Sequence, residues 1–164
     1  MKKLLIVLFT LVMTFTLSGC KKDNTDQKDN LEGTLNEILN KIYTEGTYSE
    51  EFVTYTINRL ETIEVTKDTC EYFFGTSFDY KEAIASEPLI TSKAYSLCLV
   101  RVNEDTDIEQ IKTDIKENVN PNKWVCVGVD PSNVIVDNIG DVIILIMSNE
   151  ETDALHNAFL ALAK

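Results

Sequence analysis

The chain has 164 residues, of which 44% are hydrophobic, and it carries a formal net charge of −12 at pH 7. Because a nucleic-acid backbone is also anionic, this charge opposes association with it, and we expect no nucleic-acid partner. Behind the N-terminal segments described next, about 130 residues remain, which is the usual size of one domain with one core.

The N-terminus has the layout of an export signal. Two lysines follow Met1, an apolar run extends from Leu4 to Leu17, and Ser18, Gly19 and Cys20 come next. The run is shorter than the roughly 20 residues that span a bilayer, which predicts a cleaved signal peptide over residues 1–19. An ordinary secreted protein and an uncleaved helix are the alternatives.

The four residues Leu-Ser-Gly-Cys at positions 17–20 resemble the lipobox of bacterial lipoproteins. The resemblance implies cleavage between Gly19 and Cys20 and attachment of a diacylglyceryl group, with palmitate-type acyl chains, to the Cys20 thiol. Two acyl chains hold a protein stably at a membrane. We therefore expect membrane lipid as a covalent partner and a location on the extracytoplasmic face of the cell membrane.

Residues 20–33 are predicted to be the lipidated cysteine and a disordered tether. Residues 21–30 contain no apolar side chain and so bury nothing that would offset the entropy of ordering. Fully extended, they reach about 35 Å. Lys21 and Lys22 serve as solubilising charges or attract anionic lipid. Removal of Lys2 and Lys3 with the signal leaves 13 basic against 27 acidic residues, a net charge of −14.

The folded part begins with a well-marked helix. Thr34 and Glu37 have the spacing of a capping box, and Gly46 supplies a stop signal, which predicts a helix over 35–45. Residues 49–65 are ambiguous, because their β-branched content favours a strand and Glu50-Glu51 favours a helix. A short helix is predicted over 67–74, before Gly75.

Strands dominate the second half. Strands are predicted at Tyr80–Leu89, Ala94–Val102, Trp124–Val129, Val134–Asp137 and Val142–Met147. Asn138-Ile139-Gly140 joins the last two as a hairpin. The last strand has no polar side chain, so it should be covered on both faces, or covered on one and paired with a partner on the other.

Two further capping boxes mark helices in this half. Thr106 with Glu109 predicts a helix over 107–119, and Ser148 with Glu151 predicts one over 149–163. The expected fold is therefore α+β, a mostly antiparallel sheet of about four or five strands with three to four helices packed on it, in a single domain over residues 34–164.

Three cysteines remain after Cys20, namely Cys70, Cys98 and Cys126. A disulfide could persist outside the cytoplasm, but the apolar neighbours of these residues are typical of buried free thiols, and we predict that all three are unpaired. Their spacing matches no zinc motif. We expect no metal and no cofactor.

Several charged residues are candidates for calcium binding or catalysis, and for each of them we favour a structural role. Residues 103–109 resemble a calcium loop but lack Gly at the sixth position and Glu at the twelfth, so their acids are attributed to a helix N-terminus. His156 is interpreted as a solvated helix residue. Asp130, Asp137 and Asp141 are interpreted as turn residues, with acid/base catalysis on a glycan as the alternative.

Trp124 is the only tryptophan and follows Lys123 at the entry to a predicted strand. We interpret it as a core anchor, and alternatively as a contact for a partner or ligand together with Lys123 and Arg101.

Several segments resemble a domain family of unknown function that comprises small lipoproteins of Firmicute-type bacteria. The resemblance covers roughly residues 60–162 and rests on Ser86–Ile90, Ala94–Val102, Lys116–Val127 and the hairpin at Asn138–Gly140. These are strand and turn patterns, so the resemblance implies fold and location and brings no catalytic residues.

Two functions from different classes are expected from these observations. The favoured one is a membrane-anchored, non-catalytic binding or accessory domain at the cell envelope, with an envelope protein or wall component as partner, or a second copy paired through a sheet edge. The alternative is a small envelope hydrolase that uses carboxylates near Asp130, Asp137 and Asp141.

Overall fold

The computed structural model describes residues 30–90 and 92–163. The predicted signal peptide, the lipid-acceptor Cys20 and the tether up to residue 29 lie outside the described residues. In the part of the chain that is described, no helix is both long enough and apolar enough to cross a membrane.

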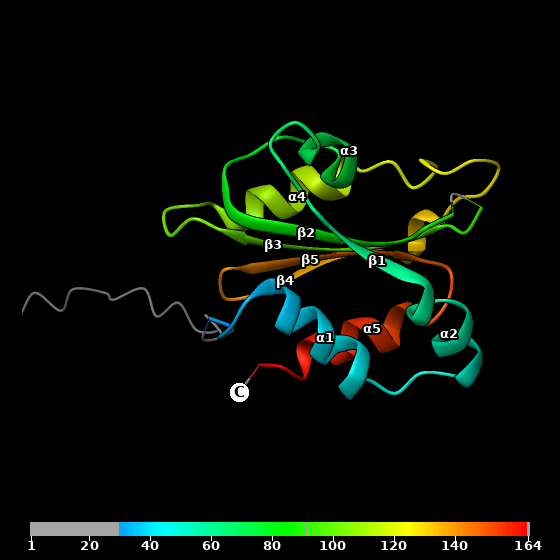
Figure 1. Cartoon of the computed structure of the whole chain (residues 1–164). Helices are drawn as coiled ribbons and strands as arrows, with labels where there is room; N and C mark the ends of the chain where they lie inside the picture. The colour runs from blue at the N-terminus through cyan, green and yellow to red at the C-terminus, as the bar shows by residue number, and fades with distance from the viewer. Residues whose placement is uncertain (1–29, 91, 164) are drawn as a thin grey trace, which may run out of the picture.

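A five-stranded antiparallel sheet forms the centre of the fold (Figure 1). Its strand order is β1-β2-β3-β5-β4. The strands are β1 (Leu60–Glu64), β2 (Tyr80–Pro88), β3 (Tyr95–Val102), β4 (Val134–Ile139) and β5 (Val142–Ser148). This confirms the α+β class.

Helices cover both faces of the sheet and enclose two hydrophobic clusters. One face is covered by α1 (Leu35–Glu45), α2 (Glu50–Tyr55) and α5 (Thr152–Leu160), and the other by α3 (Cys70–Phe74) and α4 (Ile108–Asn118). Short 3-10 turns occupy Ile57–Arg59 and Pro131–Asn133. The described residues thus hold five α-helices, more than predicted, because residues 50–55 are helical.

Two of the three inner strands, β3 and β5, are buried on both sides, as their composition predicts. All seven residues of β5 are buried, and alternate residues of β3 and β5 contribute to opposite clusters. The hairpin between β4 and β5 is also confirmed, with Gly140 at φ +53° in the left-handed region that favours glycine. The prediction that β5 is covered on both faces is therefore correct.

Of the three capping boxes predicted from the sequence, one is formed. Thr34 and Glu37 form the capping box of α1, whose bounds match the prediction. The start of α4 is capped by Asp107, whose carboxylate accepts a hydrogen bond from Gln110 N at 3.1 Å, and not by Thr106. Ser148 does not cap a helix either, because it is the last residue of β5, and α5 begins only at Thr152.

Residues 124–129 are not a strand, contrary to prediction. They form part of a loop that closes on itself, since Val129 N donates to Pro121 O at 2.8 Å and Cys126 adopts φ +61°. The ambiguous stretch 49–65 contains both structures suggested by its composition, first α2 and then, after a 3-10 turn, β1.

Candidate functional site

A buried ion pair joins the loop after α4 to the end of β2. Lys123 Nζ lies 2.5 Å from Glu87 Oε1, and the two side chains are only 3% and 11% exposed. The same ammonium lies 4.7 Å from the ring centroid of Tyr72 and 4.8 Å from that of Phe73, both on α3. Because a buried charge is costly unless it is paired, this arrangement fixes the loop against the sheet.

Trp124 lies next to this pair, with its ring centroid 5.4 Å from Lys123 Nζ. Its side chain is buried in the cluster on the α3/α4 face. The structure therefore brings Lys123 and Trp124 together and places both inside the protein, where Trp124 acts as the core anchor of the loop.

Exposed apolar side chains lie next to this buried pair, in space or along the chain. Tyr72 is 55% exposed, Leu89 is 67% exposed and Val125 is 64% exposed. Tyr72 lies against Lys123, Val125 follows Lys123 by two residues, and Leu89 follows Glu87 by two residues. We call these three residues, together with Ile90 and Val127, the apolar end. Exposed large apolar side chains gathered at one end of a domain are typical of interaction sites.

The apolar end lies opposite the point where the chain enters the domain. Entry is at Asn30, whose Oδ1 accepts a hydrogen bond from Asp141 N in the β4–β5 turn. Figure 1 shows the β2–β3 connection and the loop after α4 at the other end of β3. Ala94 of the first segment and Val127 of the second line a shared hollow of about 520 Å³. A strand of eight residues separates the two ends by about 25 Å.

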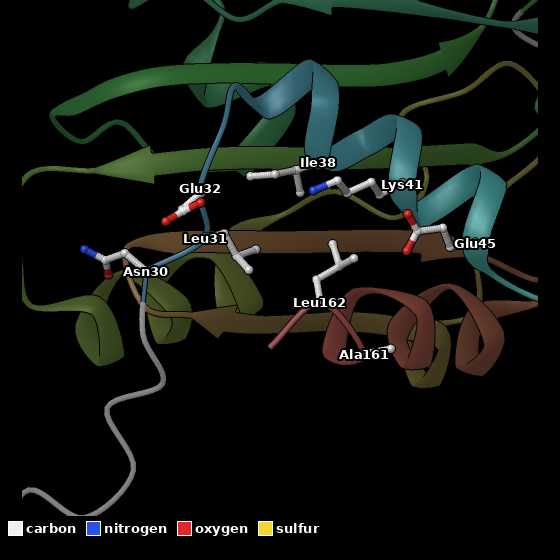
Figure 2. Close-up of a pocket in the computed structure, with 8 residues that line it drawn as sticks. All are labelled: Asn30, Leu31, Glu32, Ile38, Lys41, Glu45, Ala161 and Leu162. Carbon is white, nitrogen blue, oxygen red and sulfur yellow. The ribbon is translucent and has the colours of Figure 1, made fainter. Parts of the chain in front are cut away.

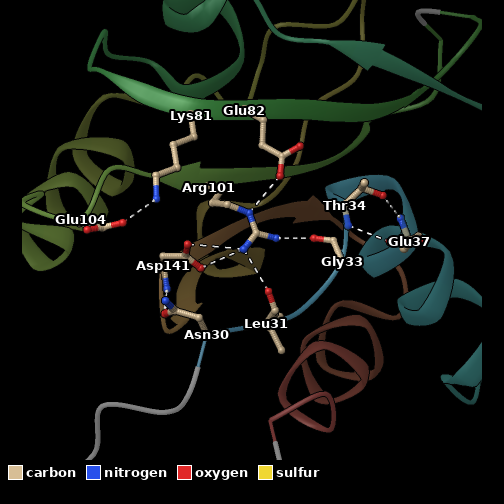
Figure 3. A network of polar contacts seen from close by, with 10 residues as sticks. All are labelled: Asn30, Leu31, Gly33, Thr34, Glu37, Lys81, Glu82, Arg101, Glu104 and Asp141. Atoms are coloured by element: carbon tan, nitrogen blue, oxygen red, sulfur yellow. Dashed lines mark hydrogen bonds and ion pairs between the residues drawn. The ribbon is translucent and has the colours of Figure 1, made fainter.

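Arg101 occupies the entry end and is part of a polar network (Figure 3). Its Nε donates to Glu82 at 2.9 Å, its Nη1 to Asp141 at 3.2 Å, and its two Nη atoms also donate to the carbonyls of Leu31 at 3.0 Å and Gly33 at 2.7 Å. A planar guanidinium suits such a multiple contact. Arg101 therefore holds the base of the tether and does not join Lys123 and Trp124.

The three candidate carboxylates are not brought together. Asp130 caps the 3-10 turn before β4, where it accepts a hydrogen bond from Ser132 N at 2.9 Å. Asp141 lies in the turn that follows β4 and accepts a hydrogen bond from Arg101. The six residues of β4 place these two at opposite ends of a strand about 20 Å long. Asp130 is thus the turn residue that the sequence indicates, and Asp141 is in addition part of the Arg101 network.

Asp137 instead pairs with the only histidine. His156 Nε2 on α5 lies 2.7 Å from Asp137 Oδ2 on β4, and both side chains are half-buried. Burial acts to raise the pKa of Asp137, but the hydrogen bond with His156 and that from Asn138 N outweigh it and hold the pKa below its ordinary value. Sequence reasoning missed this pair. One sequence feature could have indicated it: because side chains alternate along a strand, Asp137 lies on the same face of β4 as the apolar Ile135 and Ile139.

The cysteines differ in their surroundings. Cys70 and Cys98 are buried free thiols as predicted, and burial raises the pKa of Cys98 to about 11. Cys126 is also free but exposed, which corrects the prediction that it is buried. Its apolar neighbours are themselves exposed, since the segment is a loop at the apolar end.

A hollow of about 430 Å³ lies beside the base of the tether, between α1 and the end of α5 (Figure 2). Leu31, Ile38 and Leu162 form its apolar side, and Glu32, Lys41 and Glu45 form its charged side. Within the described ranges, no group of three or more His, Cys, Asp or Glu residues is arranged to hold a metal ion.

Comparison with known proteins identified no matching family model, no curated relative and no similar solved structure. The resemblance to small lipoproteins therefore stays a prediction from the sequence.

Proposed function

We propose that this protein is a lipid-anchored, extracytoplasmic domain that binds another component of the cell envelope and has no catalytic activity of its own. The observation that carries the proposal is the position of the apolar end, which lies at the opposite end of the sheet from the entry of the chain. An anchor at Cys20 would leave that end free to meet a partner.

The chemistry of the apolar end supports a binding role. Its aliphatic side chains lie on two loops, and the buried Lys123–Glu87 pair fixes one of these loops to strand β2. A surface with exposed apolar residues on a rigid support loses little conformational entropy when a partner covers it.

The location is supported by the sequence of residues 1–30. A tether that reaches about 35 Å keeps the domain near the membrane surface without holding it in one orientation. Arg101 fixes the point at which this tether leaves the domain.

The proposal can be tested in cells with the full-length chain. A photo-crosslinking residue is placed at Val125 in the apolar end, and at the exposed Asp105 near the entry end as a matched control. We expect a saturable adduct of defined mass from position 125 and none from position 105. Equal adducts from both positions, or none from either, would contradict the proposed binding surface.

The anchor is tested separately with Cys20→Ser. The natural chain should be found in the membrane fraction with added acyl mass, and the variant should lose both properties. Natural chain in the culture supernatant without acyl mass would overturn the proposed location.

A further inference from the structure

Strand β1 is an edge of the sheet whose outer side has no partner in the described part of the chain. It pairs only with β2, from Leu60 opposite Pro88 to Glu64 opposite Ile84. Val65 N donates to Ala83 O at 2.9 Å, so the alternation of an antiparallel ladder directs the bonds of Glu61 and Ile63 toward β2. The backbone N–H and C=O groups of Thr62 and Glu64 consequently face the open side.

The strand at the opposite edge of the sheet, β4, differs from β1 because polar side chains of the chain itself cover it. On β4, Lys116 Nζ donates to the carbonyl of Val134, Lys112 Nζ donates to Asn138 Oδ1 at 2.8 Å, and Asp137 Oδ1 accepts from Asn138 N at 2.8 Å. Covering an edge with the chain's own polar side chains is a common protection against further pairing. β1 contains no Lys or Pro and no such cover from the described residues.

The surroundings of β1 fit an extended segment. Ile63 is 40% exposed on one side of the strand. On the other side, a hollow of about 380 Å³ is lined by Thr62, Glu64, Tyr80 and Ile84. Alternate side chains of an added strand would therefore meet an apolar contact on one face and a hollow on the other.

The charges of β1 decide which kind of segment fits. Glu61 and Glu64 are exposed and are paired with no base, whereas the nearby Lys67 and Lys81 pair with Asp79 at 2.9 Å and Glu104 at 3.6 Å. A second copy of this chain would bring four carboxylates to the seam, and like charges that face each other destabilise strand pairing. A basic segment would instead neutralise them.

We propose that β1 binds an extended, basic polypeptide segment of a partner by strand addition, with cationic side chains on Glu61 and Glu64 and apolar side chains on Ile63. This inference rests on the proposed binding function and names the chemistry of the partner. The first residue of β1 lies opposite Pro88, next to Leu89. A partner at the apolar end could therefore continue directly along the edge.

The test uses the full-length protein in detergent micelles and a fluorescent seven-residue peptide, Thr-Lys-Val-Thr-Lys-Val-Thr, called the Lys/Val peptide. In an antiparallel register it places Lys opposite Glu61 and Glu64 and Val opposite Ile63. The corresponding Glu/Val peptide, with Glu in place of Lys, is the control. We expect saturable binding of the Lys/Val peptide only, weakened by salt, together with slower hydrogen exchange of the Thr62 and Glu64 amides. Binding of both peptides alike, or of neither, would overturn the inference. So would a dimer of the free chain that pairs through β1.

Two variants distinguish the contribution of backbone hydrogen bonding at β1 from that of its surface charge. Thr62→Pro removes the outward N–H without removing a bond to β2, and Glu61→Lys with Glu64→Lys reverses the charge. Each should weaken peptide binding about tenfold or more, which corresponds to about 1.4 kcal/mol. The matched control, Asp105→Lys with Glu117→Lys, makes the same charge change at exposed positions away from β1 and should bind like the natural chain.

The outcomes distinguish this inference from the proposed function. If position 125 crosslinks a cellular partner while the Lys/Val peptide does not bind, the binding function stands and the strand-addition mode is wrong. If the peptide binds normally to Thr62→Pro with an unchanged circular dichroism spectrum, the strand-addition mode is again wrong. If position 125 captures no partner, the proposed function itself fails.

Discussion

His156 Nε2 lies 2.7 Å from Asp137 Oδ2, so the only histidine of the chain ties α5 to the edge strand β4. Asn138 N also donates to Asp137, at 2.8 Å from Oδ1. Asp137 therefore accepts hydrogen bonds at both carboxylate oxygens, and these bonds favour its ionised form.

Asp137→Asn should make the stability less dependent on pH in the acid range. The pKa of Asp137 is lowered in the folded chain, so its contribution is present above the unfolded pKa of about 3.9 and is lost as pH falls through the lower folded value. Because both side chains are partly accessible to solvent, which screens their interaction, we expect an effect of about 1 kcal/mol or less at pH 6. Urea unfolding of both proteins at pH 6 and pH 3 measures it, and an unchanged difference between the two pH values would contradict the assignment.

Lys123→Met should destabilise the domain strongly. It leaves the buried Glu87 carboxylate without its counter-charge, and removing one partner of a buried pair typically costs about 3 to 5 kcal/mol. Chemical denaturation measures this loss. The control is Lys123→Met with Glu87→Leu, which removes both charges and should recover much of the stability. A double variant no more stable than the single one would show that the pair is not the cause.

The sequence predicts the local elements well where nearby residues determine them. Thr34, Glu37 and the apolar face of residues 35–42 specify α1 completely, and the run Val142–Met147 predicts a buried inner strand. Thr106 and Asp107 are both good caps, and sequence spacing does not show which one adopts the extended backbone that capping requires.

The parts that were missed depend on contacts between distant residues. Glu87 and Lys123 are 36 positions apart, and the fold of the chain alone brings them together. The β-branched residues near Trp124 favour a strand by composition, but burial of the Trp124 ring and closure of the loop onto Pro121 prevail. The same contacts leave Val125 and Cys126 exposed, and so create the apolar end.

Arg101→Lys should loosen the base of the tether. An ammonium cannot reproduce the fork that reaches Glu82, Asp141 and the carbonyls of Leu31 and Gly33 together. We expect about 1 to 3 kcal/mol lower stability and faster proteolytic cleavage before Thr34. Mass spectrometry of limited digests locates the cut. Cleavage of the natural chain at the same site and rate would contradict the role assigned to Arg101.

Cys126 should be the one thiol among Cys70, Cys98 and Cys126 that reacts in the folded protein. It is exposed, whereas Cys70 and Cys98 are buried, and burial raises the pKa of Cys98 to about 11, so almost no thiolate forms there at pH 8. Maleimide labelling of the lipid-modified chain should add one group when folded and three in denaturant. Cys126→Ser should abolish the folded-state label. If a label remained in that variant, the Cys70 or Cys98 region would open more readily than its burial indicates.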